Sequence, residues 1–337
     1  MNVSIPFQHI ALALSTATAA PRLADVGPCA VRSGDSSSFE FASNPWLNLY
    51  NFLFESAKQA RGIDDEGLGA RGYVSDDTAA ARPLTLAEHR VWNDAVDFFA
   101  RTVVTDRMGV DSLVQRVNDV LARLEPNVDL DTVPLHPELR RVLLRVMPIY
   151  RSAWWPTHDR RNRLWITEMQ KGLAERTRCL VPRAESVFLA PWPTGSIHVD
   201  ATVYANWFGA YSTHPPTRIT VSANAIGSQG IHGVEVLLHE AAHDMLVPLD
   251  SALCSEAARR NKRLPSELSH LVLFYTAGAL MKEGDPAYLP FAEEFGVWRQ
   301  SALAKRYRAM IEQEWQPYLS GERSFGEALA ALVQRLP

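Results

Sequence analysis

The chain is poor in cysteine, in clustered basic residues and in long hydrophobic runs, and each absence excludes a class of protein. The three cysteines, Cys29, Cys179 and Cys254, form no CxxC pair, which excludes a disulfide-rich scaffold and a cysteine-rich zinc ribbon. One disulfide is still possible, although buried free thiols are the favoured interpretation. The 34 basic and 38 acidic residues give a net charge of −4 and form no basic cluster, so we expect no nucleic-acid partner. No apolar run approaches the ~20 residues of a membrane-spanning helix.

The composition that remains is typical of a globular protein. Of the 337 residues, 47% are hydrophobic and 21% are charged, and this length favours about two domains.

The apolar run Ile10–Leu14 and the small residues Ala17–Ala19 resemble the core and cleavage site of a signal peptide, but no Lys or Arg precedes them. Residues 1–43 are therefore interpreted as a flexible start or a possible signal segment, and a cytoplasmic location is slightly favoured over an exported or periplasmic one.

Residues 44–182 carry the pattern of a helical domain. Asn44–Pro45 is typical of a helix start, and Thr85 and Glu88 form a capping box at a second one. Further helices are expected near residues 111–125, 137–151 and 158–176. The stretch Gly67–Gly72 matches GxGxxG, but acidic residues stand where a dinucleotide site needs a strand and a helix, so we interpret it as a loop.

The pattern changes after Pro182, where short β-branched and aromatic runs alternate with Pro, Gly and Asn. The expected strands are Ser186–Leu189, Ile197–Val199, Thr202–Tyr204 and Thr217–Val221. From about Gly233 the chain is expected to be helical again. The sequence therefore predicts a mainly α fold with a small β-sheet, of the α+β class, in which residues 183–337 form a second domain.

An HExxH motif, His239-Glu240-Ala-Ala-His243, lies in an apolar segment between Gly233 and Pro248, and the proline is expected to end the helix. Residues four apart lie on one face of a helix, so both histidines can bind one ion. Glu240 is adjacent, where it can take a proton from a metal-activated water without being a ligand. Burying these three residues is costly unless they have partners, and hydrogen-bonded core histidines are the competing interpretation.

A third ligand is expected from the apolar segment that follows the motif. Glu267 and His270 are its only residues before Lys282 with a carboxylate or an imidazole, and their i, i+3 spacing places them on one face of a helix. His270 is the favoured ligand, with Glu267 bonding a ligand imidazole. The alternative, in which Glu267 completes a His₂Glu set, stays open. The sequence thus predicts a site for one Zn²⁺ ion.

Over residues 217–285 this arrangement resembles the zincin metallopeptidases, and more narrowly the gluzincins, in which a HExxH helix, a loop and a second ligand helix follow one another. The resemblance implies that residues 183–337 are a zincin-like catalytic domain that cleaves peptide or amide bonds. It also implies that the strand at Thr217–Asn224 is a sheet edge that holds extended substrate, with Asn224 as a candidate for binding a substrate amide. Asp244, after the second histidine, departs from the uncharged residue that is usual there.

A second stretch is similar to bacterial HExxH proteins of unassigned activity. Leu268–Thr276 carries their Leu-x-His-x-x-x-Phe-Tyr-Thr pattern, which supports His270 as a ligand. Upstream, Trp154, Trp155 and His158 belong to the same resemblance. We interpret these three residues as aromatic core with a hydrogen-bonded histidine rather than as the wall of a cleft.

Hydrolysis of an amide also requires a donor that stabilises the oxyanion. Tyr288, on an expected loop, is the favoured donor; Tyr275 and His232 are alternatives, and His232 is also a candidate for binding substrate. The predicted function is therefore a zinc-dependent hydrolase, in the first place a metallopeptidase. A structural or regulatory zinc-binding helical protein without catalysis is the alternative, and the sequence predicts no oligomeric state.

Overall fold

The computed structural model describes residues 39–63, 72–75, 77–104, 113–125, 127–128, 130–205, 209–213, 217–299 and 302–337. The helices of the first half are α1 (Pro45–Ala60), α2 (Leu86–Thr102), α3 (Leu113–Ala122), η3 (Leu130–Thr132), α4 (Pro137–Ala153) and α5 (Trp155–Phe188). The later helices are η4 (Ile226–Ser228), α6 (Gly230–Ala242), η5 (His243–Met245), α7 (Val247–Arg259), α8 (Leu268–Gly284), α9 (Phe291–Glu294), η6 (Val297–Arg299), α10 (Ala302–Glu314), α11 (Gln316–Leu319) and α12 (Phe325–Gln334). The mainly helical fold with a small sheet confirms the predicted class.

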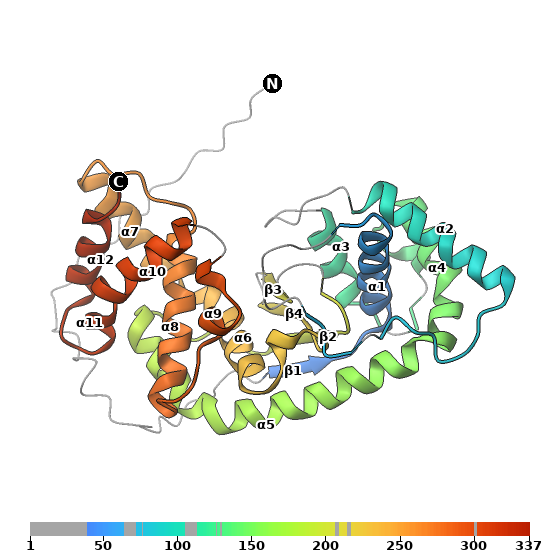
Figure 1. Ribbon diagram of the computed structural model, residues 1–337, viewed down its shortest axis with the longest axis horizontal. Coiled ribbons are helices and arrows are strands. Elements are labelled where there is room, and N and C mark those ends of the chain that lie inside the picture. Colours follow the sequence, from blue (N-terminus) through green and yellow to red (C-terminus); the bar gives the residue numbers. More distant parts are fainter. Residues whose placement is uncertain are drawn as a thin grey trace.

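A mixed four-stranded sheet lies between the two groups of helices (Figure 1). Its strands are β1 (Phe39–Ala42), β2 (Ile197–Thr202), β3 (Ala210–Thr213) and β4 (Arg218–Ser222). Their order is β1-β2-β4-β3; β1, β2 and β4 run parallel, and β3 is antiparallel to β4. Val199 of β2 lies opposite Ile219 of β4, and both are fully buried, so the centre of the sheet belongs to the core.

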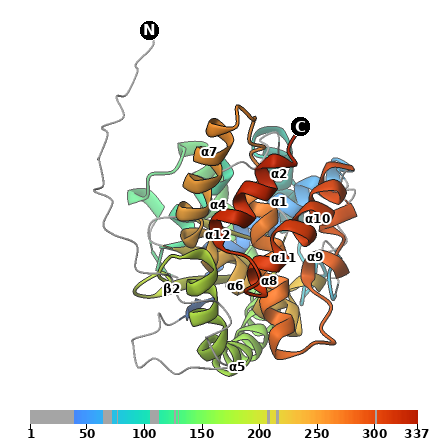
Figure 2. The same ribbon diagram turned by 90° about the vertical axis from the view of Figure 1, so that its left-hand side faces the viewer.

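Two clusters of buried hydrophobic residues form the core. One gathers α1–α4 with Val203 and Tyr204, and the other extends from α5 through the sheet to α12. The 34-residue helix α5 runs beneath both groups and connects them (Figure 1). Seen from the end in Figure 2, α8, α10 and α12 lie close together and α7 packs against α12. The domain boundary that we expected at residue 182 stays a prediction, although Pro182 lies inside α5.

A buried amide joins the first helix to the sheet. The Asn48 side chain of α1 donates to the carbonyl oxygen of Ala201 at 3.1 Å and accepts from the backbone N–H of Val203 at 3.0 Å. Asn162 of α5 donates to the same side-chain oxygen of Asn48 at 3.0 Å. Because a buried amide is costly to leave unpaired, these bonds fix α1, α5 and β2 relative to one another.

The predicted helix starts are confirmed. Asn44 caps α1, since its side-chain oxygen accepts from the backbone N–H of Trp46 at 2.8 Å. Thr85 and Glu88 form both bonds of a capping box at α2. These motifs act through neighbours in the sequence, and for this reason they could be identified before the fold was known.

The strand predicted at Ser186–Leu189 is wrong, because this segment forms the end of α5. Val181, Ala184 and Val187 are buried at helical spacing, so one face of α5 continues into the core to its last turn. The helix ends where Leu189 takes a positive φ of 52°. Packing of this face stabilises the helix more than its β-branched residues, and the one backbone hydrogen bond lost at Pro182, destabilise it.

Two further expectations for the first half need correction. Part of the supposed flexible start, Phe39–Ala42, is the edge strand β1, while the candidate signal residues lie outside the described ranges. The thiols also differ from the expected buried free cysteines: Cys254 is exposed and free, and Cys179 is disulfide-bonded. Most of the GxGxxG stretch lies outside the described residues as well.

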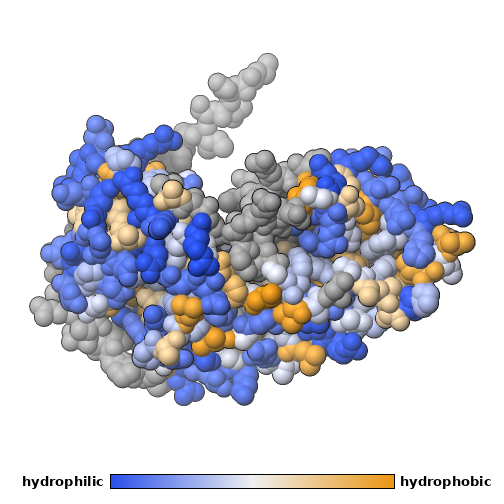
Figure 3. Space-filling view, in the orientation of Figure 1, coloured by the Kyte–Doolittle hydropathy of each residue, from blue (hydrophilic) through white to orange (hydrophobic). Residues whose placement is uncertain are grey.

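Hydrophilic residues cover most of the face shown in Figure 3, and hydrophobic residues form small patches along its lower part. The most exposed large hydrophobic side chains come from different elements and are Leu86, Leu164 and Val247. Singly exposed side chains of this kind are common on protein surfaces. Within the described ranges, we find no helix that combines the length and the hydrophobicity needed to cross a bilayer.

His158 confirms the aromatic-core interpretation. It is fully buried, its Nδ1 lies 2.9 Å from the hydroxyl of Tyr150, and its Nε2 lies 3.0 Å from the carbonyl oxygen of Asp77. The ring of Phe52 meets it edge-on at 4.9 Å. Burial lowers the pKa of His158 to about 4, so the imidazole is neutral at physiological pH.

Mild acid should therefore destabilise the fold through His158. In the unfolded chain its pKa returns to the ordinary value of 6.5, so the unfolded state binds the proton first as the pH falls. The difference in pKa corresponds to about 3 kcal/mol of unfolding free energy lost by pH 4. We expect urea unfolding to show a larger loss between pH 7 and pH 4 for the wild type than for His158→Gln. Equal losses in the two proteins would contradict this origin.

Candidate metal centre

The HExxH segment begins in α6, which holds His239 and Glu240 and packs against α5, α8 and the sheet. The helix begins at Gly230, whose φ of +55° favours glycine. Val234 and Leu237 are almost fully buried in the core. Gly233 permits a close approach of the chain, because a Cβ at this position would lie 2.3 Å from the carbonyl oxygen of Ser228. The motif is thus fixed on a rigid, buried helix.

This helix ends earlier than predicted. α6 stops at Ala242, and residues His243–Met245 form the 3₁₀ turn η5. Pro248 does not end the helix but lies in the first turn of α7, where a missing backbone N–H has no helical partner to lose. His243 still has helical angles, with φ −55° and ψ −36°, so its spacing from His239 is that of consecutive helical turns.

Three imidazoles converge between α6 and α8. The candidate ligand atoms of His239, His243 and His270 all lie within 4.8 Å of one another. The Nε2 atoms of His239 and His270 are 3.2 Å apart, and the three ring centroids are between 4.9 and 5.2 Å apart. His239 is buried, His243 is half-buried and His270 is exposed. The structure therefore brings the favoured third ligand to the motif.

The donor set fits a divalent cation. Zinc binds imidazole nitrogens at ~2.0–2.1 Å, which places two tetrahedral ligands ~3.3 Å apart. The 3.2 Å between the Nε2 atoms of His239 and His270 agrees with that spacing. Burial, with added repulsion from His243 and His270, lowers the pKa of His239 well below its usual value. Burial, then repulsion from His243, lowers the pKa of His270 to about 4. Both imidazoles are therefore neutral at physiological pH and can offer lone pairs to an ion.

Glu240 lies beside the triad without joining it. Its Oε2 is 3.8 Å from Nε2 of His243, which is longer than a hydrogen bond. The residue is 9% exposed, so the carboxylate faces the interior more than the solvent. This position suits a group that exchanges protons with a molecule bound at the triad.

Asp244, which departs from the zincin pattern, has a partner in the sheet region. The hydroxyl of Thr217, the residue before β4, donates a hydrogen bond to its carboxylate. The bond connects η5 to the start of the strand and so restrains the end of the HExxH segment. An acidic residue after the second histidine is therefore compatible with a convergent triad.

The strand expected at the sheet edge is central instead. β4 pairs with β2 on one side and with β3 on the other, so β3 is the outer strand on that side of the described sheet. Asn224 follows β4, and its buried side chain accepts from the backbone N–H of Ser75 at 3.2 Å and donates to the Ser75 carbonyl at 2.9 Å. This amide fastens residues 72–75 to the sheet, and its role in binding substrate stays a prediction.

The two tyrosines considered as oxyanion donors have other partners. The hydroxyl of Tyr275 donates to Oε1 of Gln316 at 2.9 Å. The hydroxyl of Tyr288 donates to the buried carboxylate of Glu235. Either tyrosine would have to leave this partner to reach an oxyanion, and the assignment of a donor stays a prediction.

His232 and Glu267 do not belong to the converging group. Nε2 of His232 lies 2.9 Å from the carbonyl oxygen of Leu289. Glu267 is exposed at the N-cap position of α8, and the metal-binding group found among the described residues consists of histidines alone. The geometry therefore supports His270 over Glu267 as the third ligand. A bond from Glu267 to a ligand imidazole stays untested.

Two residues on α6 and α8 that lie near the histidines were not predicted from the sequence. The ring of Phe274 lies 4.1 Å from that of His239 and 4.7 Å from that of His270. Glu235 is only 2% exposed, and burial raises its pKa to about 7. Phe274 follows His270 by four residues and Glu235 precedes His239 by four, so helical spacing could have indicated both.

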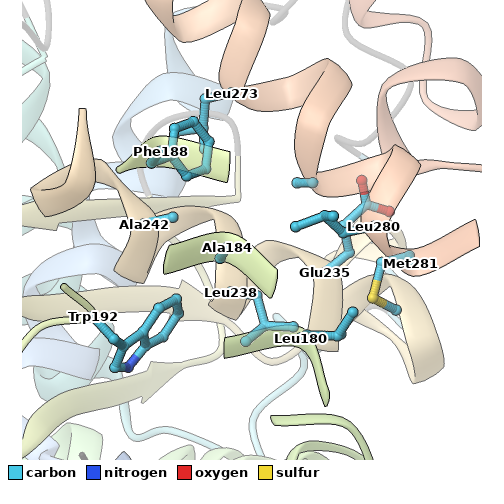
Figure 4. A pocket seen from close by; sticks show the side chains of 11 residues that line it. Leu180, Ala184, Phe188, Trp192, Glu235, Leu238, Ala242, Leu273, Leu280 and Met281 are labelled. Carbon is cyan, nitrogen blue, oxygen red and sulfur yellow. The ribbon is translucent and has the colours of Figure 1, made fainter. Parts of the chain in front are cut away.

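A small apolar cavity lies between α5, α6 and α8. Figure 4 shows Glu235 among hydrophobic side chains, including Leu238 of α6 and Leu273 of α8. Its volume is about 30 Å³. None of the three histidines lines this space, so it is separate from the triad.

Comparisons with protein-family models, with curated proteins and with solved structures found no match for this chain. The inference of function therefore depends on the triad and on the residues that surround it.

Removal of one imidazole should abolish tight metal binding. We expect the wild type, purified without added metal or chelator, to contain about one zinc ion, and His243→Ala and His270→Ala to contain little, because two ligands bind zinc weakly. Mass spectrometry of the native protein measures the stoichiometry. His89→Ala, which removes an exposed histidine of α2, is the control and should retain the metal. Loss of zinc from Glu267→Ala but not from His270→Ala would contradict the histidine triad.

Proposed function

We propose that this protein is a zinc-dependent hydrolase of the HExxH type that cleaves peptide or amide bonds. The observation that carries the proposal is the convergence of three histidines, His239, His243 and His270, from two helices. Glu240 lies beside them, with its carboxylate 3.8 Å from His243. The site thus combines a donor set for one ion with a nearby group that can accept a proton.

Each residue would have a distinct role. The three histidines would hold the ion through neutral imidazole nitrogens. When bound, Zn²⁺ would supply Lewis acidity, which brings the pKa of a water molecule to about 7. Glu240 would accept the proton that the attacking water loses and then donate it to the leaving nitrogen. The products of such a reaction are a carboxylic acid and an amine.

Three protein ligands would leave one coordination position open, and this supports catalysis over a structural role. Structural zinc sites generally have four protein ligands, whereas catalytic sites have three and leave one position for water or substrate. Three residues converge in the described part of the chain, and His270 is exposed, so solvent has access to the site. This arrangement favours a hydrolase over the alternative of a structural or regulatory zinc-binding protein.

The substrate class is inferred from the resemblance to zincins. A HExxH helix followed by a second ligand helix is the gluzincin order, and α6 and α8 have this order here. The set of three histidines differs from the His₂Glu set of thermolysin-type enzymes. We therefore extend the proposal to a gluzincin-like core but not to any one peptidase specificity.

The variant Glu240→Gln distinguishes a zinc-dependent hydrolase from a structural or regulatory zinc-binding protein. The amide cannot accept a proton, so we expect hydrolysis to fall by ~10²–10⁴-fold while the bound zinc stays near the wild-type level. A screen that includes peptides and muropeptides, followed by mass spectrometry of the products, measures activity. Glu175→Gln makes the same chemical change at an exposed site on α5 and should leave hydrolysis unchanged.

One result would contradict the hydrolase, and another would contradict the role of Glu240. If the zinc-loaded wild type cleaves none of the substrates in the screen, the structural or regulatory alternative gains support. If Glu240→Gln cleaves as fast as the wild type, Glu240 is not the proton acceptor.

A further inference from the structure

The ring of Phe274 in α8 contacts the rings of both His239 and His270. Its ring is tilted by 34° against His239 at a centroid distance of 4.1 Å and by 40° against His270 at 4.7 Å. Both are contact distances for tilted aromatic rings. The Nε2 atoms of the same two histidines are 3.2 Å apart, so one phenyl ring contacts the pair that would share an ion.

The second ring nitrogen of His239, Nδ1, has no polar protein partner among the described residues. A ligand histidine normally donates its other ring N–H to a carboxylate, a carbonyl oxygen or a water, and this bond fixes the orientation of the ring. In the described part of the structure, Nδ1 of His239 is buried and has no hydrogen-bond partner. Ring packing is the contact that restrains this imidazole among the described residues, and Phe274 makes a close ring contact with it.

The buried carboxylate of Glu235 restrains Phe291, whose ring stacks on Phe274. The ring of Phe291 stacks on Phe274 at 6.3 Å with an interplanar angle of 12°. The backbone N–H of Phe291 donates to Oε2 of Glu235 at 2.9 Å, and the hydroxyl of Tyr288 donates to the same oxygen. Glu235 thus binds two points of the segment that follows α8 and fixes Phe291 against Phe274.

Gly278 allows this segment to lie directly on α8. A Cβ at Gly278 would come within 2.5 Å of Cβ of Pro290 and 3.4 Å of Oε1 of Glu235. A side chain here would therefore displace the segment. Because Gly278 of α8 has no side chain, Glu235 of α6 and Pro290 can lie directly against it.

We propose that Phe274 is a positioning residue of the metal centre, which orients the imidazoles of His239 and His270 by ring contact, and that Glu235 supports it through Phe291. The aromatic contact takes the place of the hydrogen bond that a ligand histidine usually makes. This inference rests on the proposed function to the extent that the triad must bind an ion. It assigns no proton transfer or substrate contact to Phe274.

The first test compares zinc affinity with and without the ring. We expect Phe274→Leu to weaken zinc binding by ~10–100-fold, which is the usual effect of losing a residue that supports a metal ligand. Phe274→Tyr keeps the ring and should bind zinc nearly as tightly as the wild type. Competition with a chromophoric chelator measures the dissociation constant, and the visible spectrum of the Co²⁺-substituted protein reports the ligand geometry.

Phe325→Leu is the matched control. Phe325 is a partly buried phenylalanine that packs against the same core, but its ring contacts are with Trp315 and Tyr318. Its loss should lower the melting temperature of the zinc-free protein without changing zinc affinity. This control separates a general loss of packing from a specific effect on the histidines.

The second test removes the support behind the ring. Glu235→Leu leaves the hydroxyl of Tyr288 and the backbone N–H of Phe291 without their acceptor, so zinc affinity should fall in the same direction as in Phe274→Leu. Glu235→Gln keeps an acceptor oxygen at that position and should restore most of the affinity. Circular dichroism of each zinc-free variant establishes that it is folded.

The outcomes distinguish this inference from the proposed function. A wild type that binds no zinc would overturn the proposed function and the positioning role with it. A wild type that binds zinc only as tightly as folded Phe274→Leu would overturn the positioning role alone. If Phe274→Leu does not fold, Phe274→Met replaces the ring with a flexible side chain of similar size, and unchanged zinc affinity in that variant overturns the proposal equally.

Discussion

The burial of His239 in an apolar helix is the constraint on which the rest of the site depends. A buried imidazolium would be costly, and the pKa of His239 accordingly lies well below its usual value. The neutral ring faces His270 with only 3.2 Å between the two Nε2 atoms. Two lone pairs repel at this distance unless a proton or a cation lies between them. The pair is close enough to share a proton in a hydrogen bond, and together with His243 it could hold a metal ion where the motif and α8 meet.

The surrounding fold holds these groups at a fixed separation. α6, η5 and α8 provide the imidazoles, and the bond from Thr217 to Asp244 restrains the end of the HExxH segment at the sheet. Glu235 lies one helical turn before His239, and it fastens the chain that follows α8 by two hydrogen bonds. A ligand pair on separate helices stays aligned only if both helices and the segment behind them are packed without freedom to slide.

Sequence reasoning succeeded where the cause of a structure is local. The caps at Asn44 and Thr85 are bonds between near neighbours, and α4, found at Pro137–Ala153, was expected over almost the same residues. It failed where packing between distant segments decides. Ser186–Leu189 has a strand-like composition but completes the buried face of α5, and the four residues of β3 that make β4 central carry too short a pattern to predict.

The sequence by itself determined that His239 and His243 share a helix face with Glu240 beside them, because helical periodicity is a property of the backbone. It also reduced the third ligand to two residues on the next apolar helix. Only the tertiary structure decided between them, since the approach of α8 to α6 places His270 at the motif and leaves Glu267 outside the converging group. The contact of Phe274 with both imidazoles has the same origin, because the distance between two helices depends on the packing of side chains far apart in the sequence.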